Sequence, residues 1–136
     1  MVSALELHED IANEFKNLSF KRKHRYMICK LSDDQKSAIV EKIGARDSTF
    51  EDFQNDMPKD EPRWAVYEIE WTSDDQRKEA KVIFINYSPD NAKVPKDRFA
   101  YSQFKSAVRA KIDPIHKELQ VNDHADINWN AFREEF

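Results

Sequence analysis

One stretch of the chain, SPDNAKVPKDRFAYSQFKSAVRAKI at residues 88–112, joins a turn to a strongly patterned helix. Pro95 suits the first helical turn, because its φ is already helical and its missing N–H would have no partner there. Steps of about 100° per residue place one set of apolar residues on the same side: Ala100, Tyr101, Phe104, Ala107, Val108 and Ile112. We therefore expect this helix to bury one face in the core.

The flank of the same helix is basic. Arg98, Lys105 and Arg109 fall together, and Lys96 lies in the first turn. The helix dipole disfavours cations there by about 0.3 kcal/mol or more, so Lys96 and Arg98 break a local preference. Such an exception indicates a binding surface, and an ordinary solvated face is the alternative interpretation. Lys111 points into the apolar sector, so it must either extend its amine to solvent or mark an irregularity at the helix end.

Length and composition narrow the class of protein. The 136 residues fit one domain, residues 1–136, that is large enough to bury a core. With 22 basic and 26 acidic residues the net charge is −4, so no nucleic-acid partner is expected. The single cysteine, Cys29, excludes an intramolecular disulfide, and the single glycine excludes Gly-rich phosphate loops. Neither a secretory signal nor an apolar run of about 20 residues is evident, which predicts a cytoplasmic protein.

The remaining patterns predict the element order αββαββαβα. A helix is expected over residues 5–18, capped by Ser3, and a hairpin of strands over 26–31 and 38–43. Further elements are a helix over 49–57, strands over 64–71 and 81–87 joined by a projecting loop over 72–80, a strand over 115–121 and a closing helix over 126–136. The run Val82-Ile83-Phe84-Ile85 is apolar at both odd and even positions, so this strand needs cover on both faces. The predicted fold class is therefore α/β, with a central mixed β-sheet sandwiched between helices.

Catalytic and metal-binding patterns are weak. The four histidines, His8, His24, His116 and His124, show no zinc-ligand spacing, so neither a metal nor a cofactor is predicted. His124 and Asp126 are close in sequence, which leaves a small cytosolic enzyme open as an alternative if acid and base meet in space. No serine or cysteine lies in a recognisable nucleophile setting, and the chain is better suited to binding than to catalysis.

Four segments, taken in order, resemble the actin-depolymerising factor/cofilin family. They are the strand PRWAVY at residues 62–67, the turn YSPDNA at 87–92, the helix start KDRFAY at 96–101, which continues to Lys105, and the strand LQVND at 119–123. The likeness spans Ser3 to Arg133, and four matching segments in the family's order are specific where one would not be. The resemblance implies the ADF-homology (cofilin-like) fold and binding without catalysis.

The resemblance also implies a function. We expect a cytoplasmic, monomeric actin-binding protein of the actin cytoskeleton that binds both actin monomers (G-actin) and filaments (F-actin), prefers ADP-bound subunits, and promotes filament severing, depolymerisation and turnover. The contact with the actin cleft is assigned to the long helix and the amino-terminal segment: Ser3, Ala4, Lys96, Arg98, Lys105 and Arg109.

Two kinds of regulation follow from the same resemblance. Ser3 is the expected phosphorylation site, where a phosphate would add about −1.5 to −2 charges to a surface that favours the opposite sign. Phosphoinositide lipids would compete with actin for the basic residues Lys93, Lys96, Arg98, Lys105, Arg109 and Lys111.

A second, filament-specific site is expected on the projecting hairpin and the closing helix, at Lys78, Lys81, Arg133 and Glu134. Glu79 occupies a position that is often basic in the family, and the sequence ends at Phe136 where many members continue. The alternative within the family is therefore a monomer sequesterer, or a filament side-binder with little severing.

Overall fold

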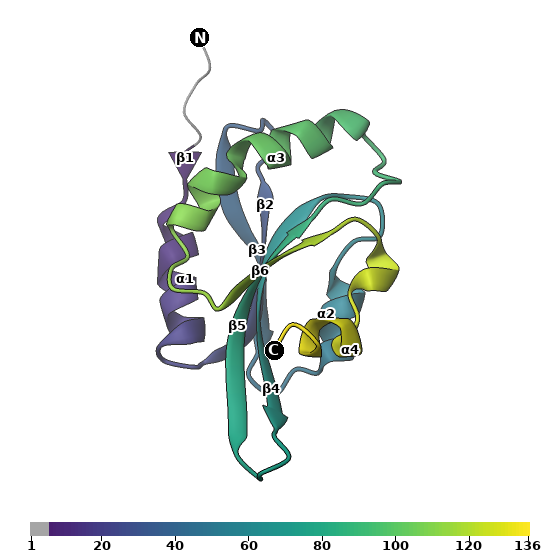
Figure 1. Cartoon of the computed structure of the whole chain (residues 1–136). Helices are drawn as coiled ribbons and strands as arrows, with labels where there is room; N and C mark the ends of the chain where they lie inside the picture. Colours follow the sequence, from purple (N-terminus) through teal and green to yellow (C-terminus); the bar gives the residue numbers. More distant parts are fainter. Residues whose placement is uncertain (1–5) are drawn as a thin grey trace.

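The computed structural model describes residues 6–136 and has one six-stranded sheet at its centre (Figure 1). In chain order the elements are β1 (Glu6–Leu7), α1 (Glu9–Ser19), β2 (His24–Leu31), β3 (Ser37–Ala45), α2 (Phe50–Asp56), β4 (Arg63–Thr72), β5 (Lys78–Tyr87), α3 (Pro95–Ala110), β6 (Lys117–Val121), a 3-10 turn (His124–Asp126) and α4 (Trp129–Arg133). The strand order is β1-β3-β2-β4-β5-β6. The outer pairs β1/β3 and β5/β6 are parallel and the inner pairs antiparallel, so the predicted mixed sheet is confirmed.

Helices cover both faces of this sheet, with α1 and α3 on one face and α2 and α4 on the other (Figure 1). The central strand β4 shows why. Trp64 and Val66 pack into the core cluster that contains residues of α1 and α3, whereas Ala65 and Tyr67 pack into the cluster that contains residues of α2 and α4. Because neighbouring residues of a strand point to opposite faces, the continuous apolar run needs two layers of helix, as predicted.

The β4–β5 hairpin is longer than expected. Thr72 pairs with Lys78, so the ladder takes in residues 72 and 78–80 of the predicted loop, and residues 73–77 form the turn. Gln76 has a positive φ of 68°, and Ser73 accepts the Arg77 N–H through its hydroxyl, which closes the turn. The hairpin end projects away from the body of the molecule (Figure 1). The sequence of this end of the hairpin is polar, because a ribbon outside the core has no face to bury. A polar segment of this kind predicts a loop when the sequence alone is considered.

The amino-terminal helix starts later than predicted. It begins at Glu9, and its cap is His8, whose Nδ1 accepts the Asp10 N–H at 3.2 Å. Residues 6–7 instead form β1, parallel to β3, and Leu7 packs against the α1/α3 core cluster. The assignment of Ser3 as the helix cap was therefore wrong. Ser3 and Ala4 themselves lie outside the described residues.

The closing helix is interrupted. Asp123 and Asn128 each start a short helix by accepting a backbone N–H two or three residues ahead, and Ile127 between them has a non-helical ψ of 84°. The predicted single helix over 126–136 is thus a 3-10 turn followed by α4, whose Phe132 is buried. The last strand is also shorter at its start than predicted, because β6 begins at Lys117.

The single glycine gives a test of the packing around β2 and β3. A Cβ built on Gly44 would lie 2.2 Å from Cε2 of Tyr26, the residue opposite it on β2, so the ring crosses the strand where no side chain stands. The ring also packs edge-on against Phe53 at 5.1 Å. We expect Gly44→Ala to lower the free energy of unfolding by about 1–3 kcal/mol, the usual cost of overpacking. Urea denaturation measures this change, and Ala45→Ser, at the exposed neighbouring position, is the control. Equal midpoints for Gly44→Ala and the wild type would contradict the packing of Tyr26 over Gly44.

Candidate functional site

Helix α3 lies across one end of the sheet (Figure 1), and its apolar side packs into the core cluster that it shares with α1. Tyr101 and Val108 are buried, and Ile112 just beyond the helix is buried too, which confirms the predicted core face. The Tyr101 hydroxyl accepts the Leu31 N–H at 2.9 Å, and its ring lies 4.6 Å from that of Trp64. Burial raises the pKa of Tyr101, so the phenol stays neutral as it accepts this bond. The helix is therefore fixed in rotation, and its opposite side must face solvent.

The predicted basic flank is present, and each of its members has an acidic partner. Arg98 donates from Nε to Ser88 Oγ at 3.0 Å and from Nη2 to Asp90 Oδ1 at 3.1 Å. Lys105 Nζ lies 3.0 Å from Glu118 Oε2, and Arg109 Nε lies 3.6 Å from Glu118 Oε1.

These acidic partners stabilise the basic flank of α3 within the fold, which the sequence pattern did not reveal. The side chains of Arg98, Lys105 and Arg109 remain 30–36% exposed in these pairs. Ion pairs of this kind are worth about 1 kcal/mol or less, so a carboxylate from a partner can exchange with Asp90 or Glu118 at little cost.

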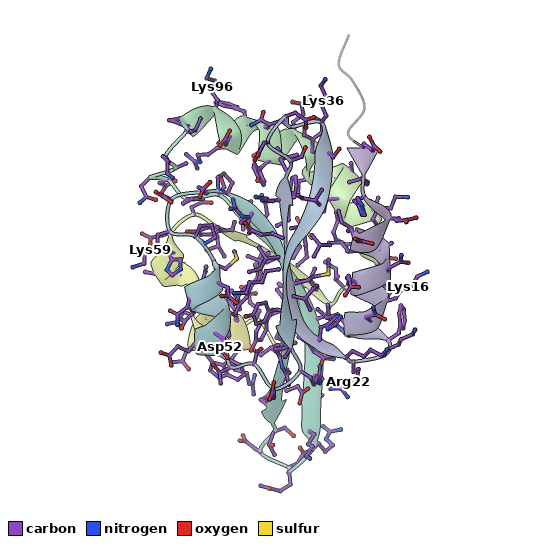
Figure 2. The ribbon with its side chains drawn as sticks, turned by 180° about the vertical axis from the view of Figure 1, so that it is seen from behind. Lys16, Arg22, Lys36, Asp52, Lys59 and Lys96 are labelled. Carbon is purple, nitrogen blue, oxygen red and sulfur yellow. The ribbon has the colours of Figure 1, made fainter. Side chains whose placement is uncertain are left out.

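The other cations of this region are exposed. Lys93 lies in the turn before the helix, and Lys96 extends from its amino-terminal end, as Figure 2 shows. Lys111, predicted to point into the apolar sector of the helix, is instead exposed, because the helix ends at Ala110 and Lys111 is its C-cap residue.

Two exposed apolar residues next to the basic flank were missed. Phe99 is 80% exposed and Val94 is 43% exposed. Phe99 lines a groove with Pro95, Arg98 and residues of the strand β6 and the loop after it. The signal was available, since Phe99 falls outside the apolar arc of the helix that buries Tyr101 and Val108. We call this region the α3 surface: Val94, Lys96, Arg98, Phe99, Lys105 and Arg109.

The second predicted set lies at the opposite end of the molecule, around the β4–β5 hairpin and α4 (Figure 1). The guanidinium carbon of Arg133 lies 4.0 Å from the ring centre of Trp71, on which Phe136 also stacks at 5.7 Å. This contact joins α4 to the hairpin.

The two lysines of this set are not together. Lys78 pairs with Thr72 and Lys81 with Ile69, and because they are three residues apart on β5 they point to opposite faces. Lys78 is exposed and Lys81 is half-buried, while Glu134 is exposed at the end of α4.

The structure does not bring His124 and Asp126 together as an acid–base pair, and His124 has a structural role. His124 Nε2 lies 2.8 Å from the Gln54 carbonyl oxygen and 3.1 Å from that of Met57, so it ties the 3-10 turn to α2. Asp126 is exposed. Among residues 6–136 no group of three or more potential metal ligands comes together, and no helix is long and apolar enough to cross a bilayer.

Comparison with known proteins agrees with this architecture. The family described as cofilin/tropomyosin-type actin-binding protein matches residues 4–136. Actin-depolymerizing factor 2 of Petunia hybrida is 33% identical over 131 residues, covering 96% of this chain and 91% of that protein. Actin-depolymerizing factor 1 of Arabidopsis thaliana is also 33% identical, over 96% of this chain and 94% of its own length.

Among solved structures, cofilin of Streptomyces griseoflavus superposes with a TM-score of 0.88 at 27% identity, covering 97% of this chain and 96% of that one. The members of the matching family act by binding actin and are not enzymes, which removes the catalytic alternative. The chain belongs to the actin-depolymerising factor/cofilin family of actin-binding proteins.

Proposed function

We propose that this protein binds actin monomers and filaments and promotes filament severing, depolymerisation and turnover. The observation that carries the proposal is the presence of two exposed surfaces at opposite ends of one sheet, the α3 surface and the hairpin with α4 (Figure 1). A filament offers two neighbouring subunits to a bound protein, whereas a monomer offers one. A ligand with two such surfaces can therefore distinguish filament from monomer and bias the orientation of the subunits it joins.

The α3 surface suits an acidic protein cleft. It combines one large exposed aromatic side chain, Phe99, with Lys96, Arg98, Lys105 and Arg109 around it. Aromatic and arginine side chains are the commonest anchors of protein interfaces, and a basic rim speeds association with an acidic partner such as actin. By family likeness we assign the preferred partner as the ADP-bound subunit, and the working location as the cytoplasmic actin cytoskeleton.

Phosphoinositides are proposed as competitors for the same cations. Lys96 and Lys111 are separated by 15 residues along one helix, or about 22 Å of axis. One headgroup cannot span that distance, so the predicted set divides into one group at the start of α3, Lys93, Lys96 and Arg98, and another at its end, Lys105, Arg109 and Lys111. Phosphate on Ser3 is proposed to act by repulsion, through the negative charge that it adds to the amino-terminal segment.

Charge reversal on α3 tests the monomer contact. We expect Arg98→Glu combined with Lys105→Glu to weaken binding to ADP-actin monomers by at least ten-fold, because it removes two cations and adds two repulsive carboxylates. The matched control is Lys16→Glu combined with Lys59→Glu, which changes net charge equally at exposed sites away from α3 (Figure 2). Monomer affinity is measured by fluorescence titration and folding by circular dichroism. A folded α3 variant that binds like the control would refute the assignment.

The aromatic anchor can be tested separately. We expect Phe99→Ala to weaken monomer binding by about ten-fold, equivalent to 1.4 kcal/mol, since most of an exposed aromatic ring would be buried in the complex. Stability should be unchanged, because Phe99 is 80% exposed. Phe20→Ala removes another exposed ring, 64% exposed at the end of α1, and serves as the control. Equal monomer affinities for the two variants would exclude Phe99 from the contact.

The filament surface is tested by sedimentation with pre-formed filaments and by imaging filament length. The wild type should co-sediment and shorten filaments by internal breaks. Lys78→Glu combined with Lys81→Glu should lose both effects, because two carboxylates replace two cations on the hairpin. Monomer affinity should stay within two-fold, because the hairpin lies at the opposite end of the molecule from α3. If the wild type instead moves actin to the supernatant without breaks or co-sedimentation, the protein is a monomer sequesterer.

A further inference from the structure

A cluster of arginines surrounds two glutamates at the base of the hairpin. Arg22, Arg25 and Arg46 come from the α1–β2 loop, from β2 and from the end of β3, and all three contact Glu70 on β4. Arg22 and Arg46 also contact Glu68, whose side chain is only 5% exposed. The three guanidinium groups exceed the two carboxylates by one charge. We call this set, with Lys78, Glu79 and Ala80 that complete its rim, the arginine recess.

Most donors of the arginine recess are already used. Arg25 donates to the carbonyl oxygens of Arg46 and Glu68 as well as to Glu70, and Arg46 donates to the His24 carbonyl. Partial burial alone would raise the pKa of Glu70, but Arg25, Arg46 and Arg22 outweigh it and hold the pKa below its ordinary value. Glu70 therefore stays charged among the three arginines at neutral pH.

Arg22 differs from its two neighbours. Its side chain is 49% exposed, and it reaches Glu68 at 3.2 Å and Glu70 at 2.9 Å through Nη2 alone. A guanidinium carries five N–H donors, so the Nε–H and both Nη1–H remain, and no other residue between 6 and 136 accepts them. Both two-point forks of a guanidinium group include Nη2, so the free Nε–H and Nη1–H groups point in different directions and each can donate its own hydrogen bond to an acceptor that approaches from solvent.

The loop that carries Arg22 is held in place before any partner arrives. Arg22 has a positive φ of 53°, and the backbone N–H groups of its neighbours Lys21 and Lys23 donate to the carbonyls of Lys16 and Asn17 at 3.1 and 2.7 Å. Phe20, two residues earlier, is 64% exposed. A fixed arginine with free donors, two residues from an exposed aromatic ring, is the composition of a protein-binding hot spot.

The arginine recess is continuous with the hairpin. Glu68, Glu70 and Lys78 lie on one face of the β4–β5 ribbon, whereas Trp71, which holds Arg133 of α4, lies on the other. Lys78 belongs both to the rim of the arginine recess and to the filament surface proposed above. A subunit that contacts Lys78 from this face therefore meets Arg22 as well, and Figure 2 shows Arg22 at the hairpin end of the molecule, away from Lys96 on α3.

A membrane is the weaker candidate for this surface. Lys21, Arg22 and Lys23 are three basic residues with one exposed ring, Phe20, beside them. Recognition of anionic lipids typically uses clusters of four to eight basic residues.

We propose that the arginine recess binds an acidic segment of the filament subunit contacted by the hairpin, with a carboxylate of that segment accepting a hydrogen bond from the free Nη1 of Arg22 and an apolar side chain against Phe20. This inference rests on the proposed filament binding and extends it to the face of the hairpin opposite α4.

Affinity measurements form the first arm of the test. Arg22→Gln should raise the Kd for filaments about five- to ten-fold and leave the Kd for monomers within two-fold, and Arg22→Lys, which keeps the charge but not the planar guanidinium group, should fall between. The control Lys59→Gln removes one exposed cation on the far side and should change neither value. Filament binding by Arg22→Gln within two-fold of the wild type would overturn the proposal.

Photo-cross-linking forms the second arm and separates contact from an indirect effect on the hairpin. Phe20→p-benzoylphenylalanine should cross-link to actin in filaments but not to monomers, and the adduct should map to an acidic segment; the same probe at Lys59 should give no adduct. Weakened binding by Arg22→Gln without any adduct would mean that the network only supports the hairpin, and would overturn the contact.

Two other outcomes can be told apart from a failure of the Arg22 contact. A wild type that never co-sediments with filaments would remove the proposed filament function, and this inference with it. Normal filament binding by Arg22→Gln together with reduced binding to phosphatidylserine vesicles would assign the surface to membranes instead.

Discussion

The burial of β4 and β5 on both faces is the constraint on which the rest of the structure depends. Trp64, Val66 and Phe84 need cover on one side, and Tyr67 and Ile85 need it on the other. Helix α3 can provide its share only with Tyr101 and Val108 facing inward, and this fixes the outward direction of its basic flank and of Phe99. Where the helical cover ends, the same two strands continue as a polar ribbon. The core thus determines the position of both candidate binding surfaces.

The residues of the α3 surface differ in how they are held by the rest of the protein. On α3, Arg98, Lys105 and Arg109 are paired with Asp90 or Glu118 in half-exposed contacts that a partner can replace. These internal pairs keep a chain of net charge −4 from presenting an isolated cluster of like charges, and they hold the side chains in extended positions before binding. Lys96 and Phe99 have no such role in the fold, which makes them the residues of this surface most clearly devoted to a partner.

The sequence predicted the elements with a strong apolar period and failed where two patterns compete. The apolar positions of α3, with Ile112 just after it, and the unbroken run in β5 allowed one interpretation each, and both are confirmed. Leu7 fits a helix and a strand equally well, and only its pairing partner on β3, distant in sequence, makes it a strand. The end of the ladder, at Thr72 and at residues 78–80, carries no apolar run, because this part of the hairpin extends beyond the core. The arginine recess depends on Arg22 meeting Glu68 across 46 residues, which no local pattern encodes.

The two surfaces also differ in what binding would cost. Breaking the pairs of Glu68 would leave a carboxylate that is only 5% exposed without its counter-charges, and losing one member of a buried pair costs about 3–5 kcal/mol. The arginine network therefore cannot exchange partners as the flank of α3 can. It can only add one, through the donors that Arg22 does not use internally. A surface of that kind discriminates by the placement of a single carboxylate, whereas the α3 surface tolerates several arrangements of charge. The geometry of contact at the hairpin end is for this reason more tightly specified than that on α3.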